Sequence, residues 1–190
     1  GDNTLLKFLK NKKNNNELIF KKILKILSKL QSIKDKHVIN FKNQKYKVKE
    51  YDNKILSNEA NLFSKWYAHK NLKSLRSRIF EKEYKKEVKN LLLKLKFKND
   101  TFVHRDFHIS NLIYFKNNIA VIDSQDALIG NKAYDLASLV DDVRLKTSNK
   151  FKNKVLNYYL KKSQKNKSKK FINDFEILSV LRNLKIIGIF

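Results

Sequence analysis

The octapeptide His104–Asn111, followed by Asp123, has the side chains that phosphoryl transfer requires. This reaction needs a carboxylate that orients the attacking hydroxyl group, and oxygen ligands for the Mg²⁺ that neutralises the phosphates. Asp106 matches the first requirement, and Asn111 and Asp123 match the second. A His-Arg-Asp run alone could be a chance surface cluster in a basic chain. The complete octapeptide together with Asp123 favours a catalytic loop.

A β-hairpin is expected to bring Asn111 and Asp123 together. Residues 112–115 and 119–122 are apolar and β-prone, and the polar residues 116–118 between them predict a hairpin loop. If this loop is centred on Asn117, Asn111 and Asp123 pair across the strands with Cβ atoms roughly 5 Å apart. Their oxygens then converge on a site suited to a hard cation. A register shift of one residue would break the pairing.

Residues 103–144 resemble the aminoglycoside phosphotransferase family, which has the protein-kinase-like fold. The resemblance rests on His104-Arg105-Asp106 to Asn111, Ile122-Asp123-Ser124-Gln125-Asp126-Ala127, Gly130, and Ala133-Tyr134-Asp135-Leu136-Ala137-Ser138-Leu139. Within the family the chain is most similar to bacterial cell-wall sugar kinases. Those enzymes phosphorylate the anomeric hydroxyl group of N-acetylmuramate and N-acetylglucosamine. Ser124 and Asn131 replace the usual Phe and Pro, at positions that supply no catalytic oxygen.

The resemblance implies ATP and Mg²⁺ as cofactors, and roles for individual residues. Asp106 is the expected base, and Asn111 and Asp123 are the expected metal ligands. Asp135 is expected to brace the loop by accepting backbone N–H bonds, although a helix dipole alone could favour an Asp there. His104 is expected to hold the loop through a backbone hydrogen bond rather than to react.

Other polar residues are weaker candidates for the acceptor site. Arg105 and Asp126 fit such a role, but a salt bridge or a plain surface position explains them equally well. His108 lies near Asp106, and no Cys or third His completes a zinc site with the histidines. Asp52 and Glu59 could contact sugar hydroxyl groups.

The fold class expected from this resemblance is α+β and mainly helical. The chain is expected to be the large, C-terminal lobe of a protein-kinase-like fold with a small catalytic β-hairpin. We expect residues 1–190 to form a partial lobe without the N-terminal nucleotide lobe. The only glycines are Gly1, Gly130 and Gly188, so a Gly-rich phosphate loop is absent. A Gly1–Thr4 segment follows the interlobe hinge in the resembling kinases. Such a fragment alone is expected to be inactive.

Composition narrows the class of protein. The hydrophobic share of 42% favours a globular domain, and the absence of Cys excludes disulfides and thiolate metal sites. We expect a cytoplasmic protein without a membrane span or a signal peptide. The net charge of +25 could indicate a nucleic-acid-binding module, but it is mostly Lys spread along the chain, which an AT-rich coding bias also explains.

Hydrophobic periodicity predicts helices over residues 5–9, 17–30, 58–69, 75–95, 133–144, 151–160 and 171–190. The expected apolar faces include Leu18, Trp66, Ile79 and Val143. Residues 31–53 are expected to be a long connection with short extended pieces. Residues 11–16 and the lysine-rich residues 161–170 are expected to be loops.

The sequence therefore predicts an ATP-dependent phosphotransferase for a small hydroxyl-bearing acceptor, with a cell-wall amino sugar favoured. An aminoglycoside or an amino alcohol is the alternative acceptor, and a non-catalytic nucleic-acid-binding module is the alternative class. Asp106, Asn111 and Asp123 argue against the latter, because electrostatic binding needs none of them. The sequence carries no signal for oligomeric state.

Overall fold

The computed structural model describes residues 4–11, 16–145, 147–161 and 165–190. Helices dominate this part of the chain, accompanied by three separate two-stranded antiparallel sheets, β1–β2, β3–β6 and β4–β5. In chain order the elements are α1 (Leu5–Asn11), α2 (Asn16–Gln31), β1 (His37–Ile39), β2 (Lys45–Lys47), α3 (Asn53–Ala60), η1 (Phe63–Ala68), α4 (His69–Asn71), α5 (Ser74–Leu93), β3 (Thr101–Val103), η2 (Ile109–Asn111), β4 (Leu112–Phe115), β5 (Asn118–Val121), β6 (Leu128–Gly130), α6 (Tyr134–Val140), α7 (Asn149–Leu160) and α8 (Lys165–Ile189).

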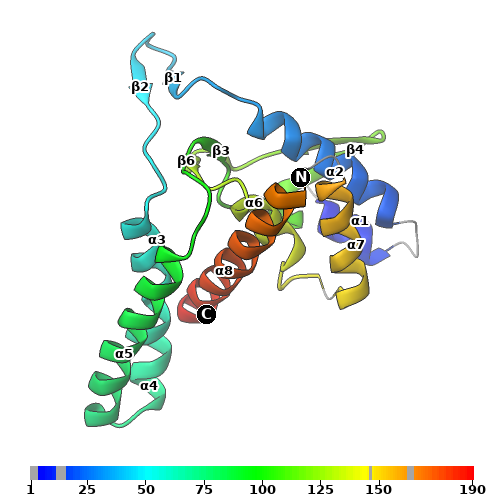
Figure 1. The fold of residues 1–190 in the computed structure, drawn as a ribbon. Coiled ribbons are helices and arrows are strands. Elements are labelled where there is room, and N and C mark those ends of the chain that lie inside the picture. The colour runs from blue at the N-terminus through cyan, green and yellow to red at the C-terminus, as the bar shows by residue number, and fades with distance from the viewer. Residues whose placement is uncertain (1–3, 12–15, 146, 162–164) are drawn as a thin grey trace.

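The long helix α8 organises the packing. It crosses the middle of the molecule, with α3, α4 and α5 on one side and α1, α2 and α7 on the other (Figure 1). α8 contacts η1, α3, α5 and α6, while α2 packs against α7 and β3. Residues 104–127, which carry most of the candidate site, connect the paired strands β3 and β6. The site is therefore supported by helices from both ends of the chain.

The amphipathic pattern of α2 forms one side of the core. Phe20, Ile23 and Leu27 are buried, and they recur at the spacing of one helix face. Leu18 was predicted to share this face, but it is exposed, because it lies on the opposite side of the helix. Burial of such side chains contributes roughly 1.5–3 kcal/mol each to folding, before the cost of ordering the chain.

Three further predicted core positions are wrong. Ile79 is exposed because it lies on the face of α5 opposite to the buried Ser77 and Val88. Val143 is exposed because α6 ends at Val140. Trp66 is exposed in η1, where a π-helical turn changes the side-chain directions that an α-helical period predicts.

A close approach between α8 and η1 depends on Gly188. A Cβ atom built there would lie 2.4 Å from the backbone carbon of Leu62 and 2.4 Å from the backbone nitrogen of Phe63. Neither is the end of a flexible side chain, so any larger residue must displace a helix. Gly188 therefore sets how near the last turns of α8 come to the helical run that starts at α3.

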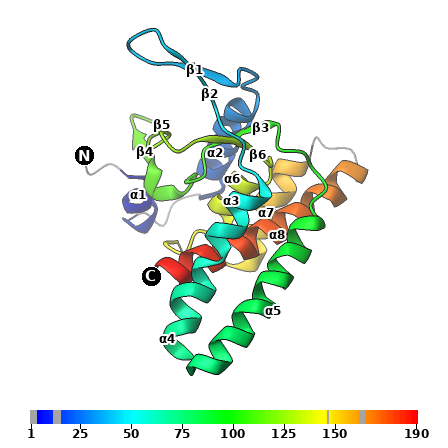
Figure 2. The same cartoon turned by 90° about the vertical axis from the view of Figure 1, so that its left-hand side faces the viewer.

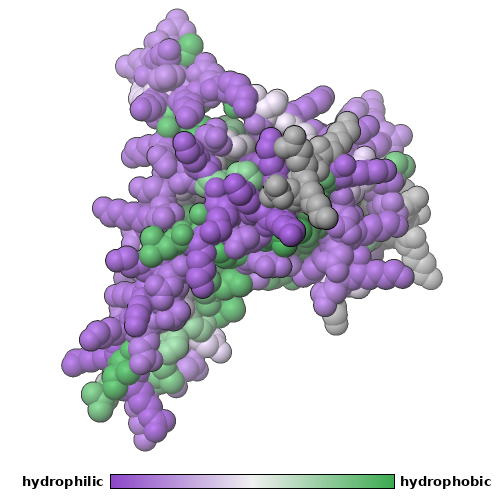
Figure 3. All heavy atoms as spheres, viewed as in Figure 1, coloured by the Kyte–Doolittle hydropathy of each residue, from purple (hydrophilic) through white to green (hydrophobic). Residues whose placement is uncertain are grey.

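The β1–β2 hairpin projects away from the rest of the molecule (Figure 2). All six of its strand residues are exposed, and Phe41 at the tip is 91% exposed. The expected extended pieces within residues 31–53 are thus confirmed. Figure 3 shows hydrophilic side chains over most of one face, with hydrophobic ones gathered near the α4–α5 turn, where Leu72 and Leu75 are exposed.

The remaining predicted helices are confirmed with shifted ends, except that residues 58–69 are divided among the end of α3, η1 and the start of α4. The predicted loop over residues 161–170 is wrong from Lys165 onward, where α8 begins. Residues 162–164, residues 12–15 of the predicted polar loop, and Gly1 to Asn3 of the predicted post-hinge segment lie outside the described residues. In the part of the chain that the structure describes, no helix has the length and apolar character needed to cross a membrane.

Candidate active site

A buried carboxylate holds the start of the 104–111 loop. Asp135, in the first turn of α6, accepts the backbone N–H of His104 at 2.8 Å and that of Arg105 at 3.1 Å. Arg105 has φ 72°, in the left-handed region that non-glycine residues rarely adopt. The two hydrogen bonds offset the cost of this backbone conformation. Asp135 thus makes the contacts that a loop-bracing residue requires.

The burial of Asp135 changes its acidity. Desolvation raises its pKa to about 7 from the ordinary 3.8, although the N–H groups of His104 and Arg105 act in the opposite direction. The carboxyl group therefore exchanges its proton near neutral pH. An ionised Asp135 accepts the two N–H bonds more strongly than a protonated one.

Asp142 holds the other end of the loop, and the sequence analysis missed it. Its side chain is buried, and its Oδ2 accepts the backbone N–H of Ile109 at 3.1 Å. Its Oδ1 accepts the backbone N–H and the guanidinium Nη1 of Arg144, at 3.0 and 3.2 Å. Asp142 lies two residues after the end of α6, where hydrophobic periodicity gave no signal for it.

His104 and His108 are both buried in the support of the loop. His104 Nε2 lies 3.0 Å from the carbonyl oxygen of Ile122, so the tautomer with a proton on Nε2 joins the loop to the end of the hairpin. Burial lowers the pKa of His104. Burial also lowers the pKa of His108, assisted by the charge of Arg144. Both rings are therefore expected to be neutral at pH 7, which suits structural support.

The backbone of Asp106 is fixed, while its carboxylate is not part of the hydrogen bonds that fix it. Its carbonyl oxygen accepts the backbone N–H of His108 at 2.9 Å and the Nδ2 of Asn111 at 3.1 Å. The residue is partly buried. Neither of these two donors forms a hydrogen bond with the Asp106 carboxylate. The geometry suits a base that must accept a proton from a bound molecule.

The hairpin has a different register from the predicted one. Its pairs are Leu112↔Val121, Ile113↔Ala120, Tyr114↔Ile119 and Phe115↔Asn118. The turn consists of Lys116 and Asn117 alone, both at positive φ, as in the tight turns that match strand twist. The predicted pairing of Asn111 with Asp123 is therefore wrong by one residue. Asn111 instead accepts the backbone N–H of Ile122 at 3.0 Å.

Asn111 and Asp123 nevertheless meet, for another reason. Asp123 has φ 70°, and this turn of the backbone follows directly on the hairpin. The Asn111 Nδ2 lies 3.3 Å from Asp123 Oδ2, and Gln125 Nε2 donates to Asp123 Oδ1 at 2.6 Å. The positive φ of Asp123 thus compensates for the one-residue difference in register, and the Asp123 and Asn111 side chains meet.

Asn111 and Asp123 together form part of a suitable site for Mg²⁺. Rotation of the Asn111 amide by half a turn presents its oxygen beside the Asp123 carboxylate, and Mg²⁺ prefers oxygen ligands. Among the described residues, no group of three or more His, Cys, Asp or Glu could hold a metal. One or two protein oxygens are the usual share when substrate phosphates and waters provide the rest.

A buried cluster of charged side chains lies beside the loop. We call Tyr51, Glu59, Arg105 and Lys185 the Glu59 cluster. The Glu59 carboxylate accepts hydrogen bonds from the Tyr51 hydroxyl and the Arg105 guanidinium, and Lys185 Nζ lies 3.1 Å from its Oε1. Burial opposes the charged form of Arg105, but Glu59 outweighs burial and raises its pKa. Lys185 and Tyr51 were not predicted as site residues.

The other predicted acceptor residues are placed differently. The carboxylate of Asp126 is exposed, and it is the backbone carbonyl of Asp126 that accepts from Arg105 Nη1 at 3.1 Å. Asp52 caps the start of α3, where its Oδ1 accepts the Ile55 N–H at 2.8 Å. One Asp52 oxygen is therefore committed to a helix end, whereas Glu59 pairs with Arg105, the residue before Asp106.

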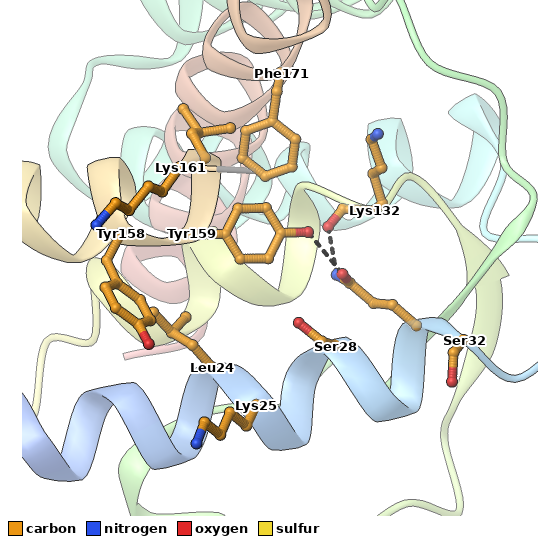
Figure 4. A pocket seen from close by; sticks show the side chains of 11 residues that line it. Leu24, Lys25, Ser28, Ser32, Lys132, Tyr158, Tyr159, Lys161 and Phe171 are labelled. Carbon is orange, nitrogen blue, oxygen red and sulfur yellow. Dashed lines mark hydrogen bonds between the residues drawn. The ribbon is translucent and has the colours of Figure 1, made fainter. Parts of the chain in front are cut away.

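A large cavity lies away from this loop. It measures about 840 Å³ and opens between α2 and α7, as Figure 4 shows. The Tyr159 hydroxyl donates to Gln31 at 2.6 Å, and Gln31 donates to the Lys132 carbonyl at 2.8 Å. Its described lining residues include lysines and hydroxyl groups but no carboxylate. The cavity therefore has no base for phosphoryl transfer, and the size of a cavity does not identify the reactive site here.

Comparisons with known proteins agree with the chemistry of the 104–123 region. The model of the phosphotransferase enzyme family matches residues 7–168. The N-acetylmuramate/N-acetylglucosamine kinase of Neisseria meningitidis serogroup B is 33% identical over 152 residues, which cover 74% of this chain and 44% of that protein. The protein of the same name from Pseudomonas aeruginosa is 31% identical over 148 residues, with 74% and 43% covered. The matched region thus spans under half the length of these curated relatives.

Proposed function

Because this chain belongs to the phosphotransferase enzyme family, we propose that it transfers the γ-phosphoryl group of ATP to a hydroxyl group of a small acceptor. The observation that carries the proposal is the placement of Asp106. The buried carboxylates of Asp135 and Asp142 hold the loop on both sides of it, and Asn111, which donates to its backbone carbonyl, also contacts Asp123. We also propose that the described elements are the large lobe of a kinase-like fold, acting in the cytoplasm.

Each proposed role follows from a contact. Asp106 accepts the proton of the acceptor hydroxyl and orients that oxygen toward the phosphorus atom. Asp135 and Asp142 keep the loop in position during the reaction. Asn111 and Asp123 would hold Mg²⁺, which supplies charge neutralisation for the phosphates when bound. Gln125 orients the Asp123 carboxylate through the bond to its other oxygen.

We propose a cell-wall amino sugar as the acceptor and its anomeric hydroxyl group as the reacting group. Support comes from the names of the relatives and from the resemblance over residues 104–139. An anomeric hydroxyl is more acidic than an ordinary alcohol, so a carboxylate base suffices to remove its proton. An aminoglycoside or an amino alcohol would need the same base, and the acceptor therefore has to be measured.

The test is a substrate panel with the product of the whole gene. Release of ADP is measured with N-acetylmuramate, N-acetylglucosamine, kanamycin and choline, and phosphorus NMR assigns the phosphorylated oxygen. We expect turnover of the sugars and phosphate on the anomeric oxygen. A preference for kanamycin or choline, or phosphate on another oxygen only, would reject the amino-sugar assignment and leave phosphoryl transfer standing. Absence of turnover with all four, together with tight nucleic-acid binding, would favour the non-catalytic alternative.

A further inference from the structure

The Glu59 cluster holds more positive than negative charge. Glu59 contributes one carboxylate, while Arg105 and Lys185 each contribute one cation. The Glu59, Lys185 and Arg105 side chains are only 14, 18 and 19% exposed. No other carboxylate of the described residues forms an ion pair with either cation. Largely buried charges are normally balanced, so a surplus cation in such a place favours an anion from outside the chain.

The other contacts of Arg105 do not remove the surplus. Its Nη1 donates to the neutral carbonyl of Asp126 at 3.1 Å, and its guanidinium carbon lies 5.1 Å from the centre of the Tyr51 ring. The Nε of Arg105 is buried and has no hydrogen-bond partner among the described residues. Lys185 uses one contact with Glu59 and has three N–H donors. Donors for an anion therefore remain on both side chains.

The cluster lies within reach of the reacting position. Arg105 directly precedes Asp106, so their Cα atoms are about 3.8 Å apart. The rings of Tyr51 and Tyr134 lie 4.9 Å apart, which packs the cluster against the start of α6. Burial raises the pKa of Tyr134, and both Glu59 and Asp106 add to that effect. Glu59 of the cluster and the proposed base Asp106 thus both disfavour ionisation of the same residue, Tyr134.

From this arrangement we propose that Lys185, with Arg105, binds the carboxylate of an acidic acceptor. The inference rests on the proposed function and names the feature of the acceptor that the site recognises. Of the two sugars in the names of the relatives, N-acetylmuramate carries a carboxylate and N-acetylglucosamine does not. Lys185 is then a specificity-determining residue, which favours the acidic sugar by an ion pair that the neutral sugar cannot form.

A purely structural role for Lys185 predicts something different. If the lysine only links α8 to α3 through Glu59, its loss should affect both sugars equally. Lys185→Met keeps most of the apolar stem and removes the charge, and Lys185→Arg keeps the charge. Lys154→Met is the matched control, because Lys154 also pairs with a glutamate, Glu17, but on α7 and α2. It removes one positive charge from the molecule without touching the Glu59 cluster.

The experiment measures kcat/KM for N-acetylmuramate and for N-acetylglucosamine with the product of the whole gene. We expect Lys185→Met to lower the ratio of acidic to neutral sugar about tenfold or more, the effect of losing one charge-assisted hydrogen bond. Lys185→Arg should retain most of the ratio, and Lys154→Met should not change it. An unchanged ratio in Lys185→Met, or an equal fall in Lys154→Met, would overturn this inference alone. Wild-type turnover of neither sugar would reject the proposed amino-sugar acceptor and this inference with it.

Discussion

At the scale of single residues, the surroundings of Asp106 and Asp135 differ in the way that their proposed roles require. Asp135 is buried, and its carboxylate accepts hydrogen bonds from two backbone N–H groups. In Asp106 the backbone carbonyl accepts the Asn111 side chain, and the carboxylate takes no part in that hydrogen bond. One acid thus positions the chain and the other can meet a substrate. The sequence predicted both residues, because each stands at a fixed place in a motif.

Substitutions at Asp106 and Asp123 should separate base from metal ligand. In the product of the whole gene, Asp106→Asn and Asp123→Ala should each lower kcat by about 10² or more, the scale of a positioned base. Asp123→Ala should also require more Mg²⁺ for half-maximal activity, because one oxygen ligand is lost. Asp106→Asn should leave that requirement unchanged. The measurement is a Mg²⁺ titration of initial rates.

Asp100→Asn is the control, since Asp100 is exposed and its carboxylate accepts a hydrogen bond from the neighbouring Thr101 hydroxyl. It should behave as the wild type. Equal Mg²⁺ requirements for the wild type and Asp123→Ala would remove Asp123 from the metal site.

The raised pKa of Asp135 makes a prediction about stability and pH. A group whose folded pKa lies above its unfolded value binds its proton more tightly in the folded state. Its contribution is fully present below the unfolded value of 3.8 and is lost as pH rises through about 7. Between pH 4.5 and 7.5, the urea-unfolding free energy of the wild type should therefore fall relative to that of Asp135→Asn. A constant difference between the two proteins would contradict the raised pKa.

At the scale of elements, the β4–β5 hairpin shows what the sequence could and could not predict. Short runs of apolar, β-prone residues predicted both strands. The register depended on whether Lys116 adopts a positive φ, which lysine does at a cost that only the complete structure offsets. The positive φ of Asp123, which brings its side chain to Asn111, cannot be predicted from hydrophobic periodicity. The Glu59 cluster was only half predicted for a similar reason, because Lys185 comes from a helix distant in sequence.

The contact between α8 and η1 makes Gly188 a position where the usual effect of alanine should reverse. Gly→Ala within a helix normally stabilises by about 1 kcal/mol. Here the new methyl group meets the backbone of Leu62 and Phe63, so Gly188→Ala should lower the free energy of unfolding by about 1–3 kcal/mol. Urea unfolding measures this difference. Val180→Ala, an exposed position on the same helix, should change stability by about 0.5 kcal/mol or less.

Gly188 lies three residues after Lys185, on the same face of α8. A shifted α8 in Gly188→Ala should therefore also disturb the pairing of Lys185 with Glu59. Stabilisation of the protein by Gly188→Ala would show that the two helices separate more easily than their packing indicates.

At the scale of the whole molecule, the net charge of +25 opposes folding through self-repulsion. The described ion pairs involve only a minority of the lysines, so added salt should screen more repulsion than attraction. We expect the melting temperature to rise by several degrees between roughly 50 and 500 mM NaCl, where the Debye length becomes shorter than typical spacings of surface charges. Sucrose at equal osmolality is the control for solute effects. A melting temperature that falls with salt would mean that the ion pairs dominate.

The projecting β1–β2 hairpin has a consequence for how the polypeptide can be divided. Its exposed tip carries Phe41 and Lys42, while its base is tied to the body by the bonds of Lys49 and Tyr51 with Ile129. Trypsin should therefore cleave first at Lys42, and the two pieces should remain associated in gel filtration, because α1 and α2 stay buried against the core. A chain that survives such a break could be assembled from two separately made polypeptides, so that isotopes could be introduced into the piece with α1, α2 and β1 alone.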